Sequence, residues 1–235
     1  THKLLLIAVC LASLAWMGCE AAETGVTGGT GGSGGTGGGG GTAVSCDICG
    51  QLDCAEFSDD TFAAPNWEVT ELLVGGTADY AASQGTDGEG NPDPYRFVRH
   101  TVGTSSSIWI AHDRQDAVYD AGVDGAIRSI HYSFDGRALE GSRQASIRPQ
   151  VKQDGRWFWT DFSSYQLINE ADGWVTKRWD DASLIPVGHS VQLDLSVDGA
   201  PITLGFSTGA SHTTGAETAT RNTGVDNWRV VICNE

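Results

Sequence analysis

Apolar and polar side chains alternate in short runs along much of the chain, and this two-residue period predicts β-strands with one buried face. The run 127–134 alternates in this way and stops at Asp135-Gly136, a pair typical of turns. The run 191–197 alternates likewise and is followed by Asp198-Gly199, after which the pattern resumes at 202–206. These two runs predict a β-hairpin.

Further strands are expected at intervals that suit a compact all-β domain. No stretch of ten or more residues shows the 3.6-residue period of an amphipathic helix. Many short strands separated by Gly-rich turns predict an all-β fold, a β-sandwich or jelly roll. The additional predicted strands cover residues 96–102, 107–112, 146–152, 156–162, 173–179 and 228–232.

The first 45 residues follow a different pattern. An apolar run over 4–16 is too short to span a bilayer comfortably, and with the residues around it predicts a signal peptide over 1–19. Residues 20–45 are rich in Gly, Thr and Ser and predict a flexible linker with a reach of about 25 Å. Residues 46–235 are left as a single β-sandwich domain.

The end of the apolar run, Ala15-Trp16-Met17-Gly18-Cys19, resembles the lipobox of bacterial lipoproteins, although Trp16 stands where that family usually has Leu. The resemblance implies that Cys19 is lipidated and becomes the mature N-terminus. The protein would then be exported and held by its lipid at the bacterial outer membrane or cell surface. The alternative is ordinary signal cleavage near Ala21 or Ala22, which would discard Cys19.

Four more cysteines belong to the predicted domain: Cys46, Cys49 and Cys54 near its start, and Cys233. An even number in an exported chain predicts two disulfides, whose pairing the sequence leaves open among three connectivities. We expect one of the first three cysteines to be bonded to Cys233. A zinc site on Cys46 and Cys49 is the alternative, although a second matching Cys-x-x-Cys is missing.

The charge of the chain restricts its partners. There are 30 acidic residues against 14 basic ones, giving a net charge of −16, and the basic residues form no cluster. Such a surface repels phosphate backbones, so nucleic acid is not expected as a partner.

Three segments together resemble a known group of domains. They are 117–127 (AVYDAGVDGAI), the strand that follows at 129–133, and the ending 224–228 (GVDNW). They are similar to bacterial exported jelly-roll domains of the concanavalin A-like or carbohydrate-binding-module kind, over most of residues 55–235. The resemblance implies a concanavalin A-like sandwich and, as the default, a glycan or polysaccharide ligand.

Catalysis is not expected. Laminarinase-type glycoside hydrolases of similar architecture carry Glu-x-Asp-x-x-Glu, and the nearest sequence here, Glu170-Ala-Asp172, lacks the second Glu. The histidines show no metal-binding spacing, and the predicted domain, residues 46–235, contains no Gly-x-Ser-x-Gly elbow. Two alternatives stay open: a glycoside hydrolase or lyase with an unconventional carboxylate pair, and a structural or adhesion lipoprotein that binds a protein partner.

Calcium is the one cofactor that the resemblance suggests. Jelly-roll binding modules often hold a structural Ca²⁺ between their first and last strands, and carboxylates suit this ion. Asp59, Asp60 and Asp226 occupy the corresponding ends of this domain. The alternative is that these residues cap strands or turns.

Sugar binding requires aromatic planes next to planar polar groups. In strand geometry Arg148 and Gln150 share one face of their strand, and Trp157 and Trp159 share one face of the next. The predicted ligand-binding residues are Trp109, Arg148, Gln150, Trp157 and Trp159. Burial of these tryptophans in the core is the alternative.

Overall fold

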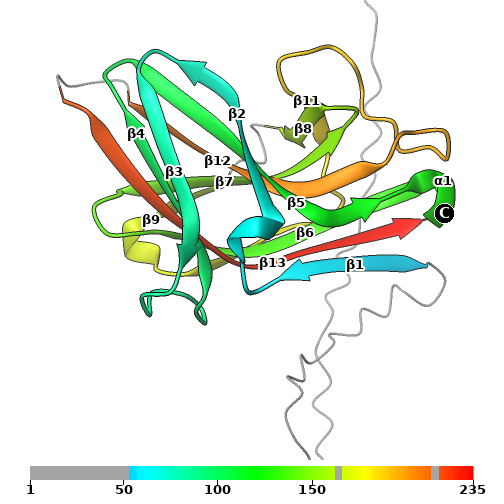
Figure 1. Ribbon diagram of the computed structural model, residues 1–235, viewed down its shortest axis with the longest axis horizontal. Helices are drawn as coiled ribbons and strands as arrows, with labels where there is room; N and C mark the ends of the chain where they lie inside the picture. Colours follow the sequence, from blue (N-terminus) through cyan, green and yellow to red (C-terminus); the bar gives the residue numbers. More distant parts are fainter. Residues whose placement is uncertain (1–52, 162–165, 213–216, 235) are drawn as a thin grey trace, which may run out of the picture. The chain divides into compact units, whose positions relative to one another are not determined.

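A computed structural model of the protein describes residues 53–161, 166–212 and 217–234. Two antiparallel sheets, called sheet A and sheet B here, pack face to face as a β-sandwich with a jelly-roll fold, which confirms the predicted fold class (Figure 1). In the part of the chain that the structure describes, no helix has the length and apolarity needed to cross a membrane. Cys19, Cys46, Cys49, the signal segment and the linker lie outside the described residues and stay predictions.

Sheet A is organised around one long strand, β13. The strand order is β10-β6-β13-β4-β3, with β1 also paired to β13. Along one edge of β13, β4 pairs with residues 219–225 and β1 with residues 228–233, while β6 takes the other edge (Figure 1). The six strands are β1 (Cys54–Asp59), β3 (Ala78–Gly85), β4 (Tyr95–Val102), β6 (Ile127–Ala138), β10 (Val175–Trp179) and β13 (Ala219–Asn234).

Sheet B has the order β11-β8-β7-β12-β5-β2, with β9 also paired to β7. The β7–β8 hairpin follows the sequence prediction, and Asp154 and Gly155 both have positive φ, as a type I′ turn requires. Its strands are β2 (Trp67–Gly75), β5 (Ser106–Tyr119), β7 (Gln144–Gln153), β8 (Arg156–Thr160), β9 (Gln166–Asn169), β11 (Leu184–Pro186) and β12 (Ile202–His212). The described helices are short: η2 (Ala64–Asn66), α1 (Ala121–Asp124) and η4 (Glu170–Asp172).

The predicted hairpin of 191–197 with 202–206 is wrong. β12 pairs with β5 on one edge and β7 on the other, so no edge remains for the run before it. Residues 191–197 do not form a strand. The side chain of Gln153 makes hydrogen bonds with the backbone of this segment, where a neighbouring strand would otherwise make them. Gln153 Nε2 donates to the carbonyl oxygens of Asp194 and Ala200, and its Oε1 accepts from the amide of Asp194.

The predicted turn at Asp135-Gly136 is also wrong, because β6 continues through it to Ala138. Gly136 instead allows sheet A to pack closely against sheet B. A Cβ at this position would collide with the side-chain ends of Ile147 and Ile168 on the facing sheet. The glycine therefore lets the two sheets approach each other.

The core holds two hydrophobic clusters that meet at a polar contact. The larger includes Phe206 and the smaller includes Ala210, and Thr208 lies between them on β12. Thr208 Oγ1 is 3.0 Å from His100 Nε2 and 3.2 Å from His112 Nε2. Both rings are fully buried, and burial lowers the pKa of His100 to about 4 and that of His112 well below its usual value.

Acid should therefore weaken the fold. Both histidines stay neutral in the folded protein, whereas the unfolded chain binds protons at them below about pH 6.5, so stability is lost as pH falls from there toward 4. His100 alone should lower the free energy of unfolding by about 2.5 kcal/mol between pH 7.5 and pH 4.5. Urea unfolding across this range measures the effect.

His100→Gln is the matched control, because glutamine keeps a polar partner for Thr208 and does not titrate. Other groups, such as the Asp113 and Asp226 carboxyls whose pKa burial raises, act equally in both proteins. The variant should show a shallower loss of stability. An identical loss in the two proteins would show that His100 is not responsible.

Candidate functional site

The five residues predicted to bind a ligand all lie on the outer face of sheet B. On β7 and β8, Ile147, Val151 and Phe158 point into the core, so the residues between them point outward. On β5, Ile108 and Ile110 are core residues, which turns their neighbour outward as well. We call this surface the aromatic face: Trp109, Arg148, Gln150, Trp157 and Trp159, with Glu68, Asp113 and Lys152 beside them.

Arg148 and two indoles form one half of the aromatic face. The guanidinium carbon of Arg148 lies 3.9 Å from the ring centroid of Trp109 and 4.4 Å from that of Trp159. The two rings meet edge to face at 5.3 Å. Trp109 lies against Gly209, where a Cβ would overlap its ring. Arg148 and Trp159 are buried and support the half-buried Trp109.

Asp113 anchors the other half, and sequence reasoning missed it. Its Oδ1 accepts from Gln150 Nε2 at 2.6 Å, and its Oδ2 accepts from Trp157 Nε1 at 3.1 Å. The residue is wholly buried, and burial raises the pKa of its carboxyl group. The indole of Trp157 is therefore held in one orientation and stays half-buried, with part of the ring accessible.

Lys152 completes this half of the face. Its Nζ lies 3.5 Å from Glu68 Oε2, 3.6 Å from Asp113 Oδ2, and 4.9 Å from the ring centroid of Trp157. Gln115 Nε2 also donates to Glu68 at 3.1 Å. One ammonium thus lies among two carboxylates and an indole, and polar groups are placed beside the exposed part of Trp157.

A signal for Asp113 is present in the sequence. The predicted strand stops at His112, but β5 continues to Tyr119. Extending the alternation from Trp109 by four residues places Asp113 on the same face. Glu68 was missed because β2, which aligns it with Asp113, was not predicted.

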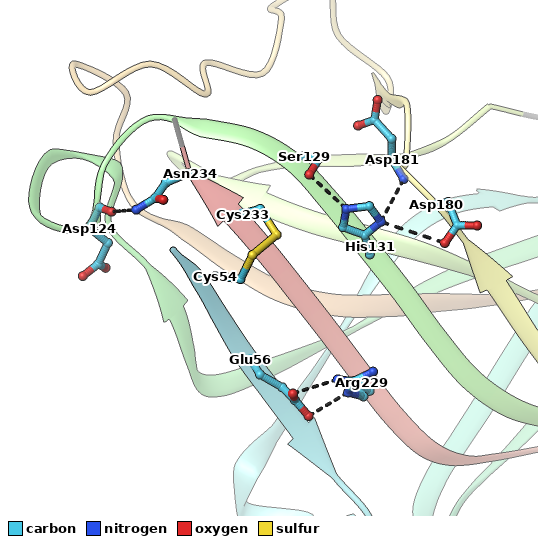
Figure 2. The surroundings of a disulfide bond; sticks show 10 residues. All are labelled: Cys54, Glu56, Asp124, Ser129, His131, Asp180, Asp181, Arg229, Cys233 and Asn234. Atoms are coloured by element: carbon cyan, nitrogen blue, oxygen red, sulfur yellow. Dashed lines mark hydrogen bonds and ion pairs between the residues drawn. A yellow bond between two sulfur atoms is a disulfide. The ribbon is translucent and has the colours of Figure 1, made fainter. Parts of the chain in front are cut away.

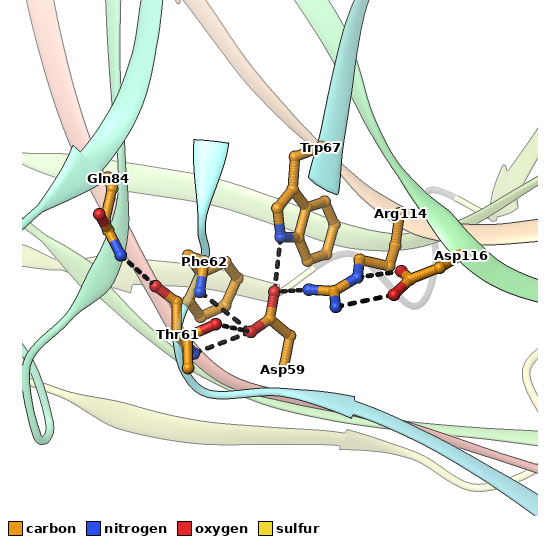
Figure 3. A network of polar contacts seen from close by, with 7 residues as sticks. All are labelled: Asp59, Thr61, Phe62, Trp67, Gln84, Arg114 and Asp116. Atoms are coloured by element: carbon orange, nitrogen blue, oxygen red, sulfur yellow. Dashed lines mark hydrogen bonds and ion pairs between the residues drawn. The ribbon is translucent and has the colours of Figure 1, made fainter. Parts of the chain in front are cut away.

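The three residues predicted to bind calcium are not brought together as a set. Asp59 forms an ion pair with Arg114 and accepts hydrogen bonds from the amides of Thr61 and Phe62 and from Trp67 Nε1 (Figure 3). Its oxygens are therefore engaged by donors, and this environment does not suit a cation ligand.

Asp226 is buried, and backbone amides engage its carboxylate. Its oxygens accept from the amides of Asn91 and Asn227, each at 2.7 Å. Burial raises the pKa of Asp226, and the charges of Asp135 and Asp60 add to this. Among the described residues, no three His, Cys, Asp or Glu side chains are grouped as a metal site. Calcium binding at Asp59, Asp60 and Asp226 stays a prediction.

The structure pairs Cys54 with Cys233, at directly opposed positions of β1 and β13 (Figure 2). This confirms that one of the first three cysteines is bonded to Cys233. Because Cys54 is in a disulfide, it is not available to a zinc site. Cys46 and Cys49 lie outside the described residues.

A serine, a histidine and an aspartate also meet on the outer face of sheet A. Ser129 Oγ lies 2.9 Å from His131 Nε2, and Asp180 Oδ1 lies 3.9 Å from His131 Nδ1 (Figure 2). The amide of Asp181 donates to Nδ1, so the proton of the neutral ring is on Nε2. A nucleophilic serine needs the opposite tautomer, and Asp180 is almost fully exposed. The arrangement therefore anchors the Asp180-Asp181 turn and does not support catalysis.

No family model matches this chain, and no curated protein matches it. A family 11 carbohydrate-binding module from Clostridium thermocellum, in complex with a β-1,3-1,4-mixed-linked tetrasaccharide, is 13% identical with a TM-score of 0.48, covering 74% of this chain and 94% of that one. The CBM22-1 xylan-binding domain from Paenibacillus barcinonensis Xyn10C is 11% identical with a TM-score of 0.38, covering 78% and 97%. These similarities are distant and concern the fold.

Proposed function

We propose that the domain binds a neutral polysaccharide on the aromatic face and does not cleave it. The observation that supports this most is the pair of half-buried indoles, Trp109 and Trp157, on one sheet face. Each has a fixed orientation, one against Gly209 and the other through its hydrogen bond to Asp113. Such rings stack on the C–H faces of sugars without losing side-chain freedom on binding.

The polar groups beside these rings suit a ligand without charge. Lys152 and Glu68 lie at the partly open rim and can exchange hydrogen bonds with hydroxyl groups. The charge of Lys152 is balanced by Glu68 and Asp113, and the chain as a whole carries −16. An acidic polysaccharide would be repelled, so the proposal is for a neutral one.

If the protein were a hydrolase, Glu68 and Asp113 would be the candidate pair of catalytic carboxylates. They lie near each other, since both are within 3.6 Å of Lys152 Nζ. Glycoside hydrolysis requires both carboxyl groups to reach the scissile bond. Asp113 is wholly buried and its two oxygens already accept from Gln150 and Trp157. Its role is to position the indole, which supports binding without turnover.

The setting of this activity is part of the same proposal. Export, a lipid on Cys19 and a Gly-rich linker would hold the domain outside the membrane, where polysaccharides are accessible. Mass spectrometry of the protein purified from membranes would detect acyl chains on Cys19.

Trp157→Ala tests the binding site. The purified protein is screened on an array of neutral and acidic glycans, and the best neutral ligand is titrated by calorimetry. Loss of the stacked ring should weaken binding at least tenfold, roughly the effect of one interface hot spot. Trp174→Ala is the matched control, since Trp174 is also half-buried and packs against Tyr95 of sheet A.

Three results would contradict the proposal. They are no binding by the folded protein, an equal loss in the Trp157→Ala and Trp174→Ala variants, and release of reducing ends from the ligand. The first would favour a protein partner, and the last would favour the hydrolase.

A further inference from the structure

A groove of about 550 Å³ lies on the outer face of sheet A, on the opposite side of the sandwich from the aromatic face. Its walls are the loop before β4 and the turn after β6, beside η4. Three neighbouring strands supply its floor, which consists of Phe97 (β4), Asn222 (β13) and Arg137 (β6). A volume of this size is typical of sites for organic ligands.

Phe97 gives the groove an aromatic surface. Its neighbour Val98 belongs to the core, so Phe97 points outward from the sheet. The side chain is half-buried and lines the groove, so part of it is accessible from there. The guanidinium carbon of Arg99 lies 5.6 Å from the ring centroid and restricts its movement. A ring held in this way can stack on the C–H face of a sugar.

The carboxylates of the walls are held in fixed positions by the protein. Glu89 Oε2 accepts from Arg137 Nη1 at 2.7 Å, which ties the loop before β4 to β6. Glu170 Oε1 accepts from the amide of Gly141 at 2.9 Å, which ties η4 to the turn after β6. The walls are therefore already formed, and a ligand does not have to order them on binding.

Asn222 adds a hydrogen-bond donor at the floor. Its Oδ1 accepts from Arg99 Nε at 3.4 Å, while its Nδ2 donates to none of the described residues. Glu140 lines the same groove and is exposed. The groove thus offers an amide donor and carboxylate acceptors close to an aromatic ring, which is the combination that sugar hydroxyls and sugar ring faces require.

The charges of the groove favour a ligand without charge. Arg137 already pairs with Glu89, and its guanidinium opposes a cation in the groove. Three further carboxylates, from Asp87, Glu140 and Glu170, repel an anion. A neutral chain that carries hydroxyl groups avoids both costs, because hydroxyls donate to carboxylates and accept from an amide.

We propose that this groove is a second site for a neutral sugar chain. Phe97 stacks on one sugar ring, and Asn222, Glu140 and Glu170 exchange hydrogen bonds with its hydroxyl groups. The class of ligand rests on the proposed function, whereas the location is a separate one. One domain then carries two sugar sites, and these face in opposite directions.

Calorimetry of the purified protein measures the number of sites. The probes are hexamers of β-1,4-linked glucose, xylose and galactose, with hexagalacturonate as the acidic counterpart. At least one neutral hexamer should bind at two sites per protein, and hexagalacturonate should bind at neither. The groove should be the weaker site, because it offers one aromatic ring and the aromatic face offers two half-buried indoles.

Variants that lack both Trp109 and Trp157 isolate the groove. In this double alanine background, Phe97→Leu keeps an apolar side chain but removes the ring, and should weaken the remaining binding about tenfold. Glu140→Ala removes an exposed carboxylate and should weaken it about fivefold. Val231→Ala is the matched control, because Val231 is also half-buried on the outer face of sheet A but lies outside the groove. Thermal unfolding verifies that each variant is folded.

The outcomes separate the groove from the aromatic face. A single site in the wild type that the double alanine variant abolishes would overturn the groove and leave the proposed function intact. Binding that Phe97→Leu abolishes and the double alanine variant leaves unchanged would support the groove and contradict the proposed function. Residual binding that neither Phe97→Leu nor Glu140→Ala weakens, or binding of hexagalacturonate as tight as that of the neutral hexamers, would overturn the groove. No binding of any neutral hexamer would overturn both sites.

Discussion

Replacing Cys54 and Cys233 together by serine is expected to lower the free energy of unfolding by about 5 kcal/mol. The disulfide joins residues 179 positions apart, and in the chain-entropy model a cross-link over such a loop restricts the unfolded chain by about this amount. Serine preserves the size of the side chains, so β1 and β13 keep their pairing. Urea unfolding under non-reducing conditions measures the change.

The reduced wild-type protein is the control for this variant. It should unfold at nearly the same urea concentration as the serine variant, and reductant should leave the variant unchanged. Typical domains have only 5 to 15 kcal/mol of stability in total, so the loss should be evident. Coincident midpoints for the oxidised wild type and the variant would exclude a stabilising role for this bond.

The Asp59→Ala substitution should destabilise the fold by about 4 kcal/mol. It leaves the guanidinium of Arg114, which is 12% exposed, with only the exposed Asp116 as counter-charge, and it removes the acceptor of Trp67 Nε1 (Figure 3). Removing one partner of a buried ion pair typically costs 3 to 5 kcal/mol. Thermal and urea unfolding provide the measurement.

Asp59→Asn distinguishes the effect of the negative charge from that of the side-chain shape. It removes the charge, but its amide oxygen can still accept from the amides of Thr61 and Phe62. It should cost less than the alanine variant. Adding Arg114→Met to Asp59→Ala should restore part of the loss, since it removes a largely buried guanidinium that is then paired only with the exposed Asp116. A double variant as unstable as the sum of its two single variants would contradict this account of the ion pair.

Short-range alternation was enough to predict the sandwich and, for the strands that carry the aromatic face, which side bears the polar residues. The faces of β7 and β8 followed from Ile147, Val151 and Phe158, which the structure places in the core. Alternation did not identify the neighbours of a strand. The run 191–197 has the period of a strand, but β12 has no edge to offer it.

Contacts between distant residues explain most of what sequence reasoning missed at the sites. The ion pair of Asp59 was not foreseen because its partner Arg114 lies 55 residues away in the chain. Asp113 was not recognised because its donors Gln150 and Trp157 belong to other strands.

The position of β13 determines the order in which the domain can be assembled. Its partners β1, β4 and β6 are all made earlier, but none of them pairs with another of the three in sheet A. During synthesis, the edge of each of these strands that pairs with β13 stays unpaired until residues 219–234 leave the ribosome. Folding by such long-range pairings is slow. The chain therefore spends time extended after synthesis, and in that state it can be exported before it becomes compact.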